Sequence, residues 1–240
     1  FTDAGLSESL IAEADAFLGL AGNNVEDTVS YITPRLPFAR SIVESDGLIA
    51  LQGALGDGDG AVAILGTGTI YIARVNNRVA SIGGWGYHVG DLGSGARLGQ
   101  MALQETLLAH DRIHQPTPLT DALLGEFSHD PPKLVAFSQR AKPGDFGRFA
   151  PQIFDFAAGG DVTALAIVRR SAAWIDEALD RVAEITHGGR LSLLGGLSTL
   201  YPPFLSDRHR ARLVAPIADA LTGAVELAVT SFVEHFEVRA

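Results

Sequence analysis

The segment from Ala61 to Gly99 contains three glycine-rich turns separated by short apolar runs. Glycine is needed where the backbone approaches a ligand closely or takes a positive φ, and ordinary turns do not need so many together. Threonines, an aspartate and a tryptophan stand among these glycines. The segment therefore predicts a site that binds phosphate through backbone N–H groups and a polyhydroxy ligand through a few side chains. The turns read GTGT at 66–69, GGWG at 83–86 and GDLGSG at 90–95.

Charge and cysteine content limit the partners. The net charge of −10 over 240 residues argues against nucleic acid and anionic membrane surfaces, because both need a basic face. Any phosphate would be held by backbone amides and a metal rather than by a lysine cluster. The absence of cysteine excludes disulfides and cysteine-held iron–sulfur clusters. No apolar run is long enough to span a membrane, so we expect a globular protein of the cytoplasm.

Apolar periodicity predicts alternating strands and helices. In the first part of the chain we expect a helix near residues 6–14, a buried strand at 16–22, a helix at 24–32, a strand at 39–43, a helix at 48–55 and a linker at 56–60. After the linker we expect antiparallel strands at 61–65, 70–75 and 78–82, helices at 94–110, 161–186 and 208–230, and a buried strand at 191–196.

The order and spacing of GTGT, GGWG and GDLGS resemble those of the N-acetylglucosamine kinases and BadF/BadG-type ATPases, within the sugar kinase, heat-shock chaperone and actin superfamily. The resemblance extends from AFLGLAG at 16–22 to GAVELA at 223–228. It implies an α/β fold of two ribonuclease H-like domains with mixed sheets and a cleft between them. We expect the first domain in residues 1–58, with a helix at 224–240 as a candidate addition, and the second in 59–223.

The chain departs from the family pattern in three places. Family members begin with a phosphate loop of the form DGGGTKT, which has no counterpart after Phe1, so we expect the first domain to be incomplete at its N-terminus. GTGT stands where GTGS is usual and keeps a hydroxyl. Leu92 stands where glutamate is usual, which removes a carboxylate beside the sugar site.

Asp46 lies between a predicted strand and a predicted helix, in the sequence SDGLIA. The local pattern by itself favours a helix N-cap. The family resemblance implies a different role, the catalytic base that accepts the proton of the attacking hydroxyl during phosphoryl transfer.

The resemblance also implies residues for each substrate. Core packing is the alternative for Trp85, and a plain hairpin is the alternative for the 66–69 turn. The residues implied for the sugar are Asp46, Gly84, Trp85, Gly86 and Asp91, and those for ATP are Gly66, Thr67, Gly68, Thr69, Ala157, Gly195 and Gly196.

The function implied is an ATP-dependent kinase that phosphorylates N-acetylglucosamine or a related amino sugar at its 6-hydroxyl. ATP and Mg²⁺ would be required, with no side chain assigned as a metal ligand, and the protein would be a homodimer. Two alternatives stay open. One is a non-catalytic sugar sensor of the same fold. The other is an activator-type ATPase, which would need the cluster thiolates that this sequence lacks.

Overall fold

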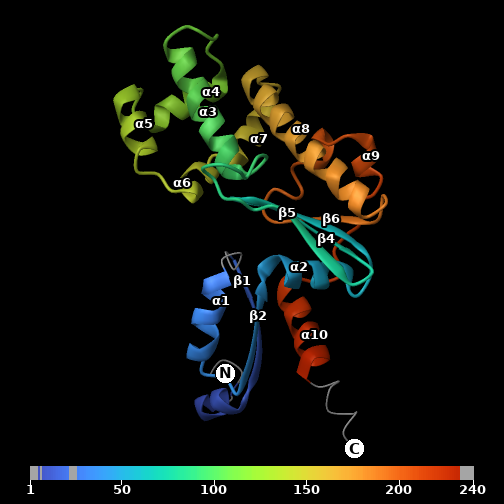
Figure 1. The fold of residues 1–240 in the computed structure, drawn as a ribbon. Helices are drawn as coiled ribbons and strands as arrows, with labels where there is room; N and C mark the ends of the chain where they lie inside the picture. The colour runs from blue at the N-terminus through green and yellow to red at the C-terminus, as the bar shows by residue number, and fades with distance from the viewer. Residues whose placement is uncertain (1–4, 6, 22–25, 233–240) are drawn as a thin grey trace, which may run out of the picture.

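The computed structural model describes residues 5, 7–21 and 26–232, and two sheets organise them (Figure 1). The smaller sheet pairs β1 (Asp15–Leu20) with β2 (Arg40–Ser45) in parallel. Around it lie α1 (Glu26–Ile32), α2 (Asp46–Leu55) and α10 (Ala220–Phe232), with short 3₁₀ turns η2 (Glu8–Glu13) and η3 (Thr33–Arg35).

The larger sheet is mixed and has the strand order β5-β4-β3-β6. β3 (Gly60–Leu65), β4 (Thr69–Val75) and β5 (Arg78–Gly83) are antiparallel, and β6 (Leu191–Leu194) joins β3 in parallel. The predicted antiparallel strands are confirmed. The turn between β4 and β5 holds Asn76 at φ 51° and Asn77 at φ 61°, the positive values that a tight hairpin requires.

Side chains alternate between the two faces of β3, because successive residues of a strand point to opposite sides. Ala61, Ala63 and Leu65 belong to the main core with the helices above the sheet in Figure 1, whereas Val62 packs against α2. The remaining helical elements are α3 (Gly95–His110), α4 (Pro118–Glu126), α5 (Pro131–Ser138), α6 (Pro143–Gly147), α7 (Ala150–Ala158), α8 (Val162–Ile185), η4 (Pro202–Phe204) and α9 (Asp207–Arg210).

The helix α2 connects the two sheets. It packs against β1 and β2 of the smaller sheet and against β3 and β4 of the larger one. Leu51, Ala54 and Leu55 of α2 form a small buried cluster with Val62 and Ile72 of the larger sheet. The first residue of α2 therefore follows the smaller sheet directly, and the buried side chains farther along the helix pack against the larger sheet.

The helices α2 and α10 cross in backbone contact. A Cβ at Gly53 would collide with the carbonyl oxygen of Asp219, and a Cβ at Gly223 would collide with Ile49 O and the backbone of Gly53. Both positions therefore require glycine for this packing distance.

A buried arginine supports the crossing. Arg74 of β4 is 7% exposed, and its Nη1 donates to Gln52 Oε1 of α2 at 2.8 Å. The Gln52 amide nitrogen donates in turn to Glu226 Oε2 of α10 at 3.0 Å. Arg74 Nη2 also donates to the carbonyls of Gly56 and Gly58 in the linker. One network thus joins β4, α2, α10 and the linker.

Three expectations need correction. The predicted helix at 208–230 is two helices, α9 and α10. Leu213 pairs with Leu191 at the sheet edge, Pro216 follows, and Asp219 accepts from Thr222 N to start α10. The helix predicted near residues 6–14 is the 3₁₀ turn η2.

The strand predicted at 16–22 is parallel, as expected, but its residues are only half-buried since they belong to a two-stranded sheet. Residues 6, 22, 24–25 and 233–240 of the predicted elements lie outside the described residues.

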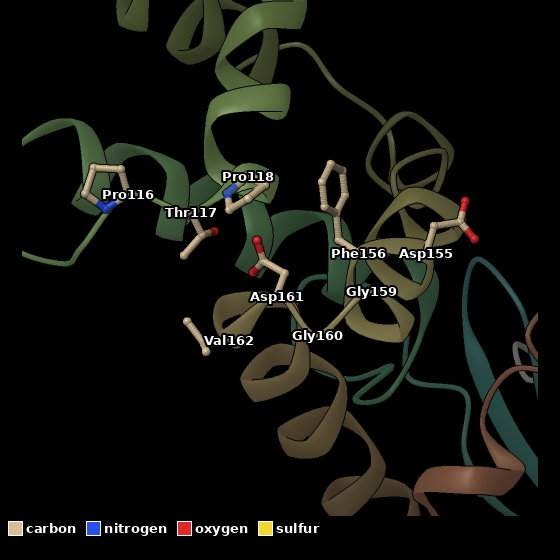
Figure 2. Close-up of a pocket in the computed structure, with 9 residues that line it drawn as sticks. All are labelled: Pro116, Thr117, Pro118, Asp155, Phe156, Gly159, Gly160, Asp161 and Val162. Carbon is tan, nitrogen blue, oxygen red and sulfur yellow. The ribbon is translucent and has the colours of Figure 1, made fainter.

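Asp161 joins two helices near the apolar pocket that Figure 2 shows. Its carboxylate accepts from Thr163 N and Ala164 N at the start of α8, and from Leu119 N at the start of α4, at 2.9–3.0 Å. Burial opposes ionisation of this carboxyl, but the hydrogen bonds, including one with Thr117, outweigh it and lower the pKa of Asp161.

Among the described residues, every helix is too short or too polar to cross a lipid bilayer.

We expect Gly53→Ala to destabilise the protein by about 1–3 kcal/mol, because the added methyl overpacks the backbone contact with α10. Gly144→Ala is the matched control, since a Cβ there meets no atom within 4 Å. The control should change the free energy of unfolding in urea by less than about 1 kcal/mol. Equal effects of the two substitutions would contradict the proposed crossing.

The lowered pKa of Asp161 predicts a pH dependence. The unfolded carboxyl titrates near its ordinary value of 3.8, so the stabilisation is complete above this value and disappears as pH falls through the lower folded pKa. Asp161→Asn keeps an acceptor oxygen but cannot ionise. Urea unfolding from about pH 5 to about pH 2 should therefore show a larger stability advantage of wild type over the variant at the higher pH. A constant difference would mean that the charge of Asp161 has no role.

Candidate functional site

A pocket of about 360 Å³ lies where β1, β2 and β3 end. It brings together residues from α2, from the turn after β3 and from the two glycine-rich turns that follow β5. Of the predicted site residues, Asp46, Gly66, Thr67, Gly68, Thr69, Gly84, Gly86 and Asp91 line it. The rest of its wall is Ala21, Ser45, Ile64, Ile70 and Ser81.

Asp46 is the first residue of α2, but it is not the cap. Ser45 caps the helix, since its hydroxyl oxygen accepts from Leu48 N at 3.1 Å. Asp46 is exposed, and its Oδ1 accepts only from the adjacent Gly47 N at 2.9 Å within the described part of the chain. The local alternative, in which Asp46 caps the helix, is therefore wrong, and this carboxylate remains available to the pocket.

The 66–69 turn has two backbone amides without a partner in the described part of the chain. Two of its carbonyls accept hydrogen bonds from the first amides of α3: Gly95 N donates to Gly66 O at 2.8 Å, and Ala96 N donates to Thr67 O at 3.3 Å. The N–H groups of Thr67 and Gly68 have no acceptor among the described residues. The turn thus sits on the N-terminus of α3, whose dipole favours an anion at this place.

The 90–95 turn is fixed to the 66–69 turn. Thr69 Oγ1 donates to the carbonyl of Leu92 at 3.1 Å, while the Leu92 side chain is 41% exposed. Asp91 has φ 53°, and its Oδ2 lies 2.9 Å from the point where a Cβ on Gly68 would be. The missing side chain at Gly68 therefore leaves the space that the Asp91 carboxylate occupies.

The GGWG turn lies at the mouth of the pocket. Gly84 and Gly86 line it at φ 73° and φ 83°, values that favour glycine. Trp85 does not line the pocket, and 74% of its surface is exposed, so the alternative of core packing is wrong. Its ring is available to a ligand that covers the mouth.

The predicted nucleoside residues lie apart from the pocket. Gly195, at φ 87°, and Gly196 are exposed after β6, next to the end of β3, because Leu197 N donates to Leu65 O at 3.0 Å. Ala157 is 4% exposed and belongs to the main core. The structure does not bring Ala157 together with the other predicted residues, since its side chain is enclosed within that core.

Sequence reasoning overlooked several wall residues. Ser81 could have been found from the alternation of β5, which places it on the same side as Gly83. Ile64 and Ile70 flank the 66–69 turn, and their apolar side chains carried no signal for a site.

Two carboxylates, Asp46 and Asp91, line the pocket. Within the described part of the chain, no three acidic or histidine side chains gather to hold a metal ion by themselves. The donor set suits a Mg²⁺ ion that keeps several waters and is bound mainly by substrate phosphates, with one or two carboxylates nearby.

Two curated relatives are sugar kinases by name. The chain is 34% identical over 227 residues to the glucosamine kinase GspK of Vibrio cholerae, covering 93% of this chain and 76% of that protein. It is 27% identical over 208 residues to the N-acetyl-D-glucosamine kinase of Dictyostelium discoideum, covering 79% of this chain and 65% of that protein.

The fold is similar to that of a solved structure from Chromobacterium violaceum, a candidate N-acetylglucosamine kinase. The TM-score is 0.87 at 35% identity, and the match covers 95% of this chain and 80% of that one. Residues 2–228, nearly the whole chain, match the BadF/BadG/BcrA/BcrD ATPase family. The chain therefore belongs to this family.

Proposed function

We propose that this protein is an ATP-dependent amino-sugar kinase that transfers the γ-phosphoryl group to the 6-hydroxyl of glucosamine or N-acetylglucosamine. The observation that carries the proposal is one pocket that combines the exposed carboxylate of Asp46 with the carboxylate of Asp91 and with the amides of Thr67 and Gly68, which have no acceptor among the described residues. The names of relatives that are 34% and 27% identical support the substrate class.

The 66–69 turn is the proposed phosphate site. Its two free amides and the α3 N-terminus beneath it supply positive potential without a lysine or arginine in the pocket wall. This suits a chain of net charge −10, whose overall field opposes anions. The nucleoside would extend toward Gly195 and Gly196, which adjoin the end of β3.

The proposed step is an in-line displacement. The sugar hydroxyl oxygen forms a bond to the γ-phosphorus while the bond from that phosphorus to the bridging β-phosphate oxygen breaks, and ADP leaves. Asp46 accepts the hydroxyl proton. When bound, Mg²⁺ neutralises charge on the phosphate oxygens.

Asp91 and the GGWG turn form the proposed sugar site. The Asp91 carboxylate beside Gly68 can accept hydrogen bonds from sugar hydroxyls close to the phosphate loop. The backbone of Gly84 and Gly86 would line the ring, and the exposed Trp85 would lie over it.

We further propose that the chain forms two ribonuclease H-like domains, residues 1–58 with the C-terminal helix from residue 224, and residues 59–223. The packing of α10 on α2 and β1 supports this division. The homodimer and the cytoplasmic location stay predictions, and analytical ultracentrifugation of the purified protein tests the first of them.

Asp46→Asn should lower kcat by about 10²–10⁴-fold and leave sugar affinity nearly unchanged, because it removes the proton acceptor and keeps the shape. Glu44→Gln is the matched control, since Glu44 is an exposed carboxylate two residues away that does not line the pocket. A coupled ADP-release assay on full-length protein, with glucosamine, N-acetylglucosamine and glucose as acceptors, measures both. Wild-type protein that binds amino sugar without releasing ADP would support the sensor alternative instead.

Asp91→Ala should weaken sugar binding by about 10- to 100-fold with a smaller effect on ATP, because a charged acceptor contributes about 1.5–3 kcal/mol. Trp85 can report the binding directly. The sequence has 2 tryptophans, so Trp174→Phe leaves Trp85 as the only one, and its fluorescence follows sugar titration. Weaker ATP binding with unchanged sugar binding would mean that the two ligands are assigned the wrong way round.

A further inference from the structure

Tyr201 is a fully buried tyrosine whose hydroxyl reaches a pocket-forming turn. It is 0% exposed, and its Oη lies 2.6 Å from Gly93 O and 2.9 Å from Ser171 Oγ of α8. The single phenol proton goes to the carbonyl, which can only accept, so the Ser171 hydroxyl donates to the phenol oxygen. The ring packs edge-on against Phe154, with centroids 5.2 Å apart.

The turn that Tyr201 contacts has little freedom. Gly93 has φ 87°, and a Cβ there would lie 2.5 Å from Ile175 Cγ1, so this glycine is pressed against α8. Two residues earlier, Asp91 is held at a positive φ with its carboxylate beside Gly68. The Gly93 carbonyl is therefore a point where the main core is bonded to the turn that carries Asp91.

Tyr201 also follows the proposed nucleoside segment. Gly195 and Gly196 lead into a helical turn in which Tyr201 N donates to Leu197 O at 3.2 Å, and Leu197 N donates to Leu65 O at the end of β3. The segment from Gly195 to Tyr201 thus makes two contacts. One is with the end of β3, just before the 66–69 turn, and the other is with the turn that carries Asp91.

We propose that Tyr201 is a positioning residue for the sugar, acting through the Gly93 carbonyl to hold Asp91 against the phosphate turn. The inference rests on the proposed function, because it takes Asp91 as a sugar ligand. Burial raises the pKa of Tyr201 and the Ser171 hydrogen bond only partly offsets this, so the hydroxyl keeps the proton that it donates.

The test compares Tyr201→Phe with Ser171→Ala. Tyr201→Phe removes the buried hydroxyl and with it both hydrogen bonds, whereas Ser171→Ala removes only one partner and keeps the bond to Gly93 O. We expect Tyr201→Phe to raise the sugar KM about five- to tenfold, the value of one hydrogen bond, with kcat and the ATP KM within about twofold. Ser171→Ala should leave all three constants within about twofold of wild type. Equal sugar KM values for the two variants would overturn the proposal.

Two further measurements test the same contact independently of steady-state rates. Hydrogen exchange of a peptide covering 90–96 should be faster in Tyr201→Phe than in Ser171→Ala, and equal rates would contradict the proposal. The double variant Asp91→Ala/Tyr201→Phe should bind sugar no more weakly than Asp91→Ala, because both act through one contact.

The outcomes separate this inference from the proposed function. Unchanged sugar binding in Asp91→Ala would overturn this inference and the assignment of Asp91 to the sugar, whereas the kinase function itself fails only if the wild-type protein releases no ADP with an amino sugar. Weakened sugar binding in Asp91→Ala, together with a normal sugar KM in Tyr201→Phe, would overturn only the role of Tyr201.

Discussion

The backbone contact between α2 and α10 determines where the candidate base can lie. α2 carries Asp46 at its first residue and meets α10 at Gly53, so the crossing sets the position of the whole helix. Side chains can adapt to a neighbour, but a backbone pressed on a backbone has little room to shift. The Arg74 network ties the same helix to the larger sheet. The separation between Asp46 and the phosphate turn therefore depends on two glycines far from both.

The 66–69 turn, the proposed phosphate site, shows how an acidic protein can prepare a place for an anion. Its Gly66 and Thr67 carbonyls accept from the start of α3, and its Thr67 and Gly68 amides have no acceptor among the described residues. Such donors are held in place before a ligand arrives, so little reorganisation is needed on binding. Thr69, the last residue of the 66–69 turn, also holds the turn that carries Asp91, because its hydroxyl donates to the Leu92 carbonyl. The proposed sites for the two substrates thus share one rigid support.

Local features could be predicted from the sequence, and long-range ones could not. The glycine turns and the β3–β5 hairpins follow from nearest-neighbour preferences. The sequence allows Asp46 to be either a helix cap or a catalytic base, and only the structure shows that Ser45 is the residue that caps α2. The break in the predicted 208–230 helix comes from pairing with Leu191, which is distant in sequence. Ala157 was placed by resemblance alone, whereas the packing of α7 puts it in the core.

The 90–95 turn is bonded to the side chains of Thr69 and Tyr201 through main-chain atoms, the carbonyls of Leu92 and Gly93. The side chain at position 92 is partly exposed and takes no part in those bonds. An exchange of glutamate for leucine there changes the charge beside the mouth of the pocket and leaves the turn intact. Under the proposed function, position 92 is thus a place where a substitution can alter the choice of sugar while the proposed phosphate site stays unchanged.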